Sequence, residues 1–279
     1  MTVEPAPPMV DPAPALVVAA PDPVDEMLDP VDELLDPFQP THVHGPYRAD
    51  RILAHTPTIS VVMPARNEAE NLKLILPRIP TWIHELIVVD GQSTDRTEDV
   101  ARAGWENVKI VRQEGTGKGD ALRRGFAVAT GDIIVMLDAD GSTDPAEIPR
   151  FIAGLRTGAD VAKGTRFVVG GGSADLTRIR TTGNWALTRL VNVLWGARLS
   201  DLCYGYFAFW RDVLEELDPR CTGFEFETLL TIRSLRAGLV MVEVPSFEAA
   251  RFTGLSQLRT MQDGMRVLRT ILAEWIRPF

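Results

Sequence analysis

The sequence predicts an α/β fold in which helices cover both faces of a mostly parallel central sheet. Three observations lead to this prediction. From Thr58 onward, short runs of apolar and β-branched residues alternate with longer segments of helical periodicity. The runs are apolar at nearly every position, as expected for strands that are covered on both faces. Four successive strands are each followed by polar residues, glycines or carboxylates.

Four strand–helix pairs are predicted in the first half of the chain. The strands cover residues 59–65, 85–90, 107–113 and 132–138, and the helices cover 67–79, 93–104, 118–129 and a segment from Asp144. Ser93 is the predicted N-cap of the second helix, and Gly104 is its predicted stop.

The second half is less regular. Strands are predicted at 159–167, 203–210 and 239–245, and helices at 177–194, 226–238 and 255–276. Trp185 and Trp195 lie on an apolar helical face, which favours packing in the core over a platform for the sugar. The last helix is amphipathic, with an apolar stripe formed by Leu258, Met261, Met265, Leu268, Leu272 and Trp275. Such a stripe indicates either a helix in a membrane interface or a helix packed on the sheet.

Charge divides the chain of 279 residues into two parts. The net charge is -9, and residues 1–50 carry ten Asp/Glu against the single base Arg48, so the remainder is balanced. We predict a disordered, Pro/Asp-rich acidic tail at 1–50 and one domain at 51–279 that includes the amphipathic C-terminal helix. The balanced body excludes a nucleic-acid binder.

The tail contains the repeat "DPVDEML" and "DPVDELL". It serves either as a solubilising segment or as a docking motif. The two cysteines, Cys203 and Cys221, have no metal-ligand spacing. Only two cysteines in a chain of this size indicate a reducing compartment and no disulfide framework. No membrane span or signal peptide is evident. The expected location is the cytoplasm, and peripheral contact with the inner face of the plasma membrane stays open.

Polar groups converge on one edge of the predicted sheet. In open α/β sheets, ligands bind beyond the carboxyl ends of the strands. Asp138 and Asp140 are two residues apart in an extended segment, so both side chains face one point. A cation between them would relieve their repulsion, and carboxylate oxygens suit Mg²⁺ or Mn²⁺. The loop "GTGKG" adds Lys118 as a partner for phosphate.

The order of these motifs resembles a known family. Residues 58–260 are similar to the family 2 nucleotide-sugar glycosyltransferases with the Rossmann-like GT-A fold, and most similar to their dolichyl/polyprenyl-phosphate sugar synthases. The motifs are "VVMPARNEAENL", "LIVVDGQSTDRT", "GKGDALRRG", "MLDADGSTDP", "GTRFVVGGG", "DLCYGYFAFWRDVL" and "RFTGLSQL".

The resemblance implies roles for individual residues. The implied nucleotide-sugar contacts are Pro64, Ala65, Arg66 and Glu68 at the nucleoside, Asp90 at the base or ribose, Lys118 near the nucleotide, and Asp138, Ala139 and Asp140 at the diphosphate. Asp138 and Asp140 would hold the metal, whereas Ser142 stands where the family often has Gln. Arg166 and loop 170–173 would lie beside the acceptor. Asp201 and Arg251 are further implied catalytic residues, and Arg251, Gly254 and Ser256 match a mobile loop over the donor.

The implied reaction is a single displacement with inversion at the anomeric carbon. The donor would be a GDP-mannose or UDP-glucose type of nucleotide sugar. A polyprenyl-phosphate acceptor is already an anion and requires no general base. A hydroxyl acceptor on a soluble, cell-wall or polysaccharide molecule requires one, and Asp201, Glu225 and Glu227 are the candidates.

Two other classes of protein fit the sequence less well. A nucleotidylyltransferase would carry a Gly-rich, basic loop after the first strand, whereas this loop reads "ARNEAEN". A sugar-nucleotide sensor without catalysis would not need the Asp138/Asp140 pair. The sequence names neither the sugar nor the base, and it leaves the oligomeric state open.

Overall fold

The computed structural model describes residues 40–42, 48–49, 51, 56–218, 223, 225–254 and 260–277. The predicted disorder and docking motif of the tail fall almost wholly on residues outside these ranges, as do Cys221 and Ser256. Two described parts of the tail contradict the prediction of disorder. Residues 40–42 form a short strand, and Arg48 forms an ion pair with Asp160 at 3.4 Å.

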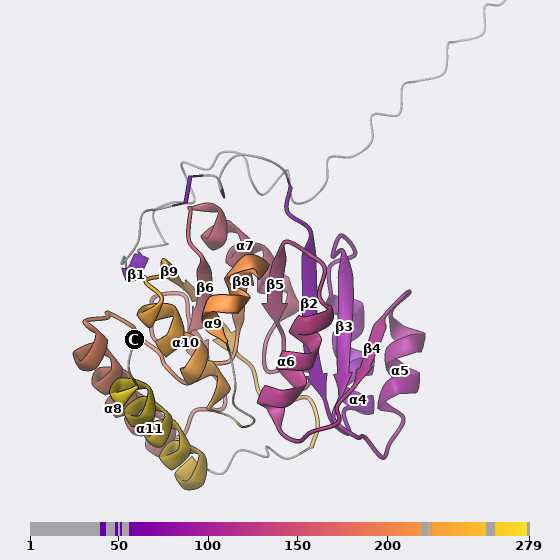
Figure 1. Ribbon diagram of the computed structural model, residues 1–279. Coiled ribbons are helices and arrows are strands. Elements are labelled where there is room, and N and C mark those ends of the chain that lie inside the picture. The colour runs from indigo at the N-terminus through magenta and orange to yellow at the C-terminus, as the bar shows by residue number, and fades with distance from the viewer. Residues whose placement is uncertain are drawn as a thin grey trace, which may run out of the picture.

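A sheet of eight strands forms the centre of the described structure (Figure 1). The strands are β1 (Pro40–His42), β2 (Ile59–Ala65), β3 (Glu85–Asp90), β4 (Lys109–Arg112), β5 (Ile133–Met136), β6 (Val161–Thr165), β8 (Phe207–Trp210) and β9 (Met241–Pro245). Their order is β1-β9-β6-β8-β5-β2-β3-β4. Neighbours from β5 to β4 are parallel, as are β6 and β9, while β8 is antiparallel to both β5 and β6. The predicted mostly parallel sheet is confirmed.

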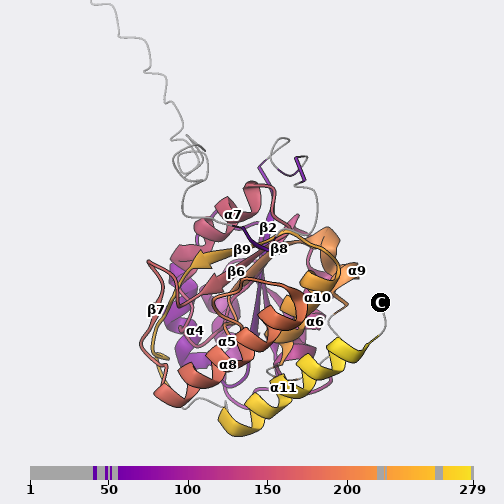
Figure 2. The same cartoon turned by 90° about the vertical axis from the view of Figure 1, so that its left-hand side faces the viewer.

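Helices cover both faces of this sheet. They are α4 (Ala69–Ile75), α5 (Thr97–Gly104), α6 (Lys118–Val128), α7 (Ile148–Arg156), α8 (Arg178–Trp195), α9 (Leu214–Leu217), α10 (Phe226–Arg236) and α11 (Thr260–Ile276). One core packs α4, α5 and α7 against the sheet, and the other packs α6, α8, α10 and α11 against the opposite face. Figure 2 shows α8 and α11 side by side outside α10. Among the described residues, no helix is both long and apolar enough to cross a membrane.

Short elements complete the connections. Three 3-10 turns cover Leu76–Arg78, Pro145–Glu147 and Arg211–Val213. A small parallel pair joins β7 (Gly172–Ser173) to β10 (Phe247–Glu248). This pair holds the loop after β6 beside the segment that follows β9.

The helix predicted at 93–104 begins four residues later, at Thr97. Ser93 is not its cap, because the Ser93 hydroxyl accepts the backbone N–H of Asn67 at 2.9 Å. The Asp95 carboxylate instead accepts hydrogen bonds from the backbone N–H groups of Thr97 and of Ala69, at 3.0 and 3.1 Å. The loops after β2 and β3 are thereby tied together, which fixes the edge of the sheet where ligands are expected.

Two aromatic predictions differ from the structure. The strand predicted at 203–210 begins at Phe207, because the preceding residues are held by side-chain bonds. The Tyr206 hydroxyl donates to the Asp144 carbonyl at 2.9 Å, and the Tyr204 hydroxyl lies 2.8 Å from Ser246 Oγ. The prediction that Trp185 packs in the core is wrong, since 63% of this residue is exposed.

Close contact between α6 and the sheet makes Gly125 a sensitive position. A methyl group there would lie 2.3 Å from Val62 Cγ1, whereas one at Gly183 in α8 would meet nothing within 4 Å. We expect Gly125→Ala to lower the free energy of unfolding by about 1–3 kcal/mol through overpacking. Gly183→Ala should raise it by about 0.5–1 kcal/mol through the backbone entropy of the unfolded chain. Urea unfolding measures both, and equal effects of the two variants would contradict the packing argument.

Candidate active site

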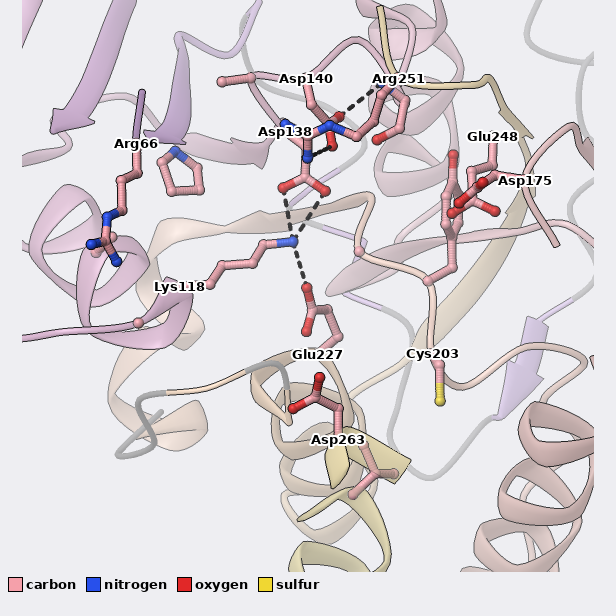
Figure 3. Close-up of a pocket in the computed structure, with 18 of the residues that line it drawn as sticks. Arg66, Lys118, Asp138, Asp140, Asp175, Cys203, Glu227, Glu248, Arg251 and Asp263 are labelled. Carbon is pink, nitrogen blue, oxygen red and sulfur yellow. Dashed lines mark hydrogen bonds and ion pairs between the residues drawn. The ribbon is translucent and has the colours of Figure 1, made fainter. Parts of the chain in front are cut away.

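A cavity of about 420 Å³ opens at the carboxyl ends of the parallel strands. The predicted site residues that line it are Pro64, Ala65, Arg66, Glu68, Lys118, Asp138, Ala139, Asp140, Arg166 and Arg251. They come from five separate segments of the chain, and Figure 3 shows several of them facing one space. Asp90 and Asp201 are not among the lining residues.

Asp138, just past β5, is bound by a lysine. Lys118 Nζ lies 2.8 Å from Asp138 Oδ1 and 2.7 Å from Glu227 Oε1, so one ammonium bridges two carboxylates (Figure 3). Burial raises the pKa of Asp138 to about 6, with Asp140 and Glu227 adding to the rise and Lys118 opposing it. Burial lowers the pKa of Lys118, but the two carboxylates outweigh it and hold the pKa above its usual value. Lys118 is therefore a fixed positive charge at the start of α6.

Gly205 leaves room for this cluster. A Cβ at this position would lie 2.9 Å from Glu227 Oε1 and 3.0 Å from Lys118 Nζ. Steric crowding thus explains the glycine in the sequence "YGY", because any side chain there would clash with the Lys118 ammonium or the Glu227 carboxylate.

Asp140 has a different cation. Arg251 donates from Nη1 to Asp140 at 2.9 Å and from Nη2 to Glu68 at 2.6 Å. Backbone bonds from Phe252 N–H to the Asp140 carbonyl and from Ala249 N–H to the Ser142 carbonyl hold the same segment, at 3.0 and 2.9 Å. The predicted loop at Arg251 therefore lies directly over the Asp138–Asp140 turn.

The Arg251 loop also contacts the first helix. Thr253 Oγ1 donates to Asn71 Oδ1 at 2.7 Å, and the Asn71 amide in turn contacts Glu68. Beneath the loop, Gly141 adopts a φ of +82°, and a Cβ there would lie 2.3 Å from the Phe252 ring. Only glycine fits this turn without moving the loop.

Arg166 is the centre of a buried ionic network. Its guanidinium donates twice to Asp201, at 2.7 and 2.9 Å, and once to Glu248 at 3.0 Å. Burial raises the pKa of Asp201, but the hydrogen bonds from Arg166 and the nearby Lys163 outweigh it, so the pKa lies below its usual value. Asp201 lies behind Arg166 and is fully buried. This placement suits Asp201 for positioning Arg166 rather than for contact with an acceptor.

Asp90 lies beside the cavity rather than in it. Its buried carboxylate accepts the backbone N–H of Ser93 at 3.2 and 3.3 Å and so shapes the turn after β3. The neighbouring Gln92 and Gln113 line the cavity near Arg66 instead. Gln113 donates to the Gly117 carbonyl at 2.8 Å, which braces the loop that leads to Lys118.

Some lining residues were not predicted. Asn184, Glu248 and Asp263 line the cavity from α8, β10 and α11. The carbonyl oxygen of the buried Asn184 side chain accepts the backbone N–H groups of Leu202 and Cys203, while its Nδ2 has no partner among the described residues. Glu248 could have been suspected from its place just after a predicted strand. Asn184 and Asp263 sit inside helices and give no local signal.

The metal-binding capacity of the site rests on oxygen atoms. No group of three or more His, Cys, Asp or Glu side chains in the described part of the chain could hold a metal ion by itself. Asp138 and Asp140 supply hard carboxylate ligands, a type that suits Mg²⁺ and Mn²⁺. The remaining ligands would have to come from a bound diphosphate and water.

Comparison with known proteins decides the family. Residues 60–218, more than half of the chain, match the family described as Glycosyl transferase family 2. The chain belongs to glycosyl transferase family 2. This confirms the resemblance inferred from the motifs and excludes the nucleotidylyltransferase alternative.

Relatives with curated names support the same family. The polyprenol monophosphomannose synthase of Mycolicibacterium smegmatis is 34% identical over 243 residues, which cover 77% of this chain and 85% of that protein. The undecaprenyl-phosphate mannosyltransferase of Micrococcus luteus is 34% identical over 212 residues, which cover 72% of this chain and 87% of that protein.

A solved structure has the same fold. The crystal structure of glucosyl-3-phosphoglycerate synthase from Mycobacterium tuberculosis, in complex with Mn²⁺, UDP and glucosyl-3-phosphoglycerate, matches with a TM-score of 0.64 and 27% identity. The match covers 86% of this chain and 87% of that chain. The predicted fold of this glycosyltransferase is therefore confirmed.

The buried network around Arg166 gives a stability prediction. Asp201→Asn removes the charge of a fully buried partner, and we expect it to lower the free energy of unfolding by about 3 kcal/mol or more. Asp175→Asn is the matched control, because Asp175 also pairs with an arginine but its side chain is 50% exposed. That variant should cost at most about 1 kcal/mol. Urea unfolding at neutral pH compares the two, and equal losses would show that the Arg166 network carries no special stability.

Proposed function

We propose that this glycosyltransferase moves a hexose from a nucleoside-diphosphate sugar to a polyprenyl phosphate, with inversion at the anomeric carbon. The observation that carries the proposal is the placement of Asp138 and Asp140. Both line the cavity at the end of β5, and a separate cation, Lys118 or Arg251, contacts each. With a divalent ion on the two carboxylates, such a turn would suit the diphosphate of a sugar donor and the charge that develops on it as it leaves.

The donor half of the proposal has support from outside the chain. Two relatives are named as mannosyl-transferring enzymes, and the matched crystal structure contains UDP and Mn²⁺. Pro64, Arg66 and Gln113 line one part of the cavity and would contact the nucleoside. Both GDP-mannose and UDP-glucose types of donor remain candidates.

Asp138 and Asp140 would hold Mg²⁺ or Mn²⁺ in this reaction. The ion would neutralise the diphosphate and stabilise it as a leaving group. Lys118 would keep a second positive charge beside Asp138, and Arg251 would bring the segment at 249–254 down onto the same turn.

The ion pairs formed by the acidic side chains in the cavity favour an acceptor that needs no general base, such as a phosphate. Every carboxylate among the lining residues is paired with Lys or Arg: Glu68 and Asp140 with Arg251, Asp138 and Glu227 with Lys118, Glu248 with Arg166, Asp175 with Arg180, and Asp263 with Arg266. Pairing with a cation weakens a carboxylate as a general base, and Asp138, whose pKa is raised despite its pairing, would serve as a metal ligand. Of the three base candidates from the sequence, only Glu227 lines the cavity. An acceptor that already carries a negative charge needs none of them.

The acceptor's phosphate would lie on the α8 side of the cavity. Arg180 and the unpartnered Asn184 Nδ2 offer donors there. Because a polyprenyl chain stays in a bilayer, the protein would act as a peripheral protein at a membrane surface.

A second candidate is transfer to a hydroxyl of a soluble acceptor. The observation in its favour is the likeness to a synthase of glucosyl-3-phosphoglycerate, which covers 86% of this chain.

The deciding experiment offers the purified protein GDP-mannose or UDP-glucose with Mn²⁺ and one of three acceptors: a short polyprenyl phosphate, the matching free polyprenol, or 3-phosphoglycerate. We expect product from the polyprenyl phosphate alone. Asp138→Asn should lower turnover about a hundredfold or more, while Asp99→Asn on the exposed face of α5 should leave it unchanged. Product from 3-phosphoglycerate alone would replace the proposal with the second candidate.

The raised pKa of Asp138 sets a pH dependence for metal binding. Its pKa of about 6 means that the carboxylate is largely ionised at pH 7 and progressively protonated below pH 6. Because a proton competes with the metal, we expect the Kd for Mn²⁺ to rise about tenfold per pH unit below pH 6. Titration calorimetry from pH 5 to 7.5 measures this. A Kd for Mn²⁺ that stays constant across that range would contradict the assignment of Asp138 as a ligand.

A further inference from the structure

Helices α8 and α11 lie next to each other on the outside of the molecule. They lie side by side in Figure 2 and run in the same direction. Their C-terminal ends meet where the Trp195 and Trp275 rings are 5.5 Å apart, edge to face. Their N-terminal ends meet at the cavity, which Asn184 and Gly264 both line.

The outward face of this pair is unusually apolar. Of the twelve exposed large hydrophobic residues in the described chain, eight lie on these two helices: Ile179, Trp185, Val193, Met261, Met265, Leu272, Trp275 and Ile276. We name these eight residues the outer ridge. Apolar residues gathered in this way mark an interaction surface, whereas single exposed ones need no explanation.

The charges on the same helices have one sign. The exposed charged side chains are all arginines, at Arg178, Arg189, Arg266, Arg269 and, just past α11, Arg277. The acids Asp263 and Glu274 are both buried, and Glu274 is bound to Arg233 at 3.2 Å on the inner side. The net charge of -9 comes from residues 1–50, and the remainder of the chain is balanced. A basic, apolar face on this balanced body matches an anionic lipid surface, where each arginine adds to the binding.

A second copy of the chain fits this face less well. A two-fold interface would bring the five arginines of each copy together, and only two acids on these helices, Asp263 and Glu274, lie beside them, next to Arg266 and Arg277. Interface cores are depleted in charge, and unpaired buried charges are costly. A bilayer accepts the same surface readily, because aromatic and aliphatic side chains enter the acyl boundary while arginines reach the head groups.

The outer ridge also borders the cavity. Ile179 belongs to both, and Arg180 and Leu187 line the cavity from the same helix. We propose that the outer ridge and its arginines dock on the surface of an anionic bilayer and so place the cavity mouth at the head groups. The biological setting of this inference rests on the proposed function, but lipid binding itself does not.

The test uses the full-length protein and two double variants. Trp185→Ser with Ile276→Ser removes apolar contacts, and Arg189→Gln with Arg269→Gln removes charge; none of these four residues lines the cavity. Leu74→Ser in α4 is the matched control, because Leu74 is also about half exposed but lies on the other face of the sheet. Sedimentation measures binding to vesicles of phosphatidylcholine with and without phosphatidylglycerol.

We expect the wild type and the control to bind only the anionic vesicles. Each double variant should bind about tenfold more weakly or worse, with an unchanged melting temperature. Undiminished binding by both double variants would overturn the docking proposal. Loss of a wild-type dimer in the apolar variant, without loss of vesicle binding, would assign the ridge to a second copy instead.

Transfer assays separate this inference from the proposed function. The double variants should keep wild-type rates toward a short, water-soluble polyprenyl phosphate and lose rate toward the same head group embedded in anionic vesicles. If no protein transfers sugar to either acceptor while the vesicle binding follows expectation, the proposed acceptor is wrong and the docking surface stands. Equal rates of all variants toward the embedded acceptor would overturn the role of the ridge in presenting the cavity.

Discussion

Two like charges at the end of β5 impose the central constraint on this structure. Asp138 and Asp140 face one cavity, and two partly buried carboxylates this close repel each other unless cations compensate them. The compensating cations come from far along the chain, 20 residues away at Lys118 and 111 residues away at Arg251. The start of α6 and the segment after β10 must therefore both reach this turn. The glycines at 141 and 205 make room for them.

The charge balance around the turn favours a divalent ion. Four carboxylates and two cations are directly linked there: Glu68, Asp138, Asp140 and Glu227 with Lys118 and Arg251. When all are ionised, two negative charges remain. A diphosphate is itself an anion, so it gains little from such a cluster unless a dication lies between them. The pKa of Asp138 is raised by burial and, in addition, by the nearby negative charges of Asp140 and Glu227. Support for a metal in the proposed reaction thus comes from the carboxylates of this chain as well as from its relatives.

The sequence predicts the site residues best where they lie just after the end of a strand. Arg66, Glu68 and Asp138 follow buried apolar runs by a few residues, so the parallel sheet alone brings them together. Asp90 ends a buried strand in the same way, but its carboxylate accepts a backbone N–H in the following turn. No local signal distinguishes a carboxylate that lines the cavity from one that braces a turn. The contributions of α8 and α11 depend on how two distant helices pack, which periodicity cannot reveal.

The burial of helix α11 explains why its sequence allows two interpretations, a helix packed on the sheet and a helix in a membrane interface. The residues Val267 and Ile271 are buried against the second core, while Met265 and Leu272, one turn or less away, are about half exposed. Packing on the domain therefore uses only the inner part of the apolar surface. The neighbouring helix α8 likewise exposes Trp185 and Val193, and water solvates such apolar side chains poorly. An amphipathic helix that needed only to cover the core would carry polar residues in those outer positions. Its apolar residues face both ways, which fits a helix that is anchored on the sheet and holds a second apolar surface toward the lipid.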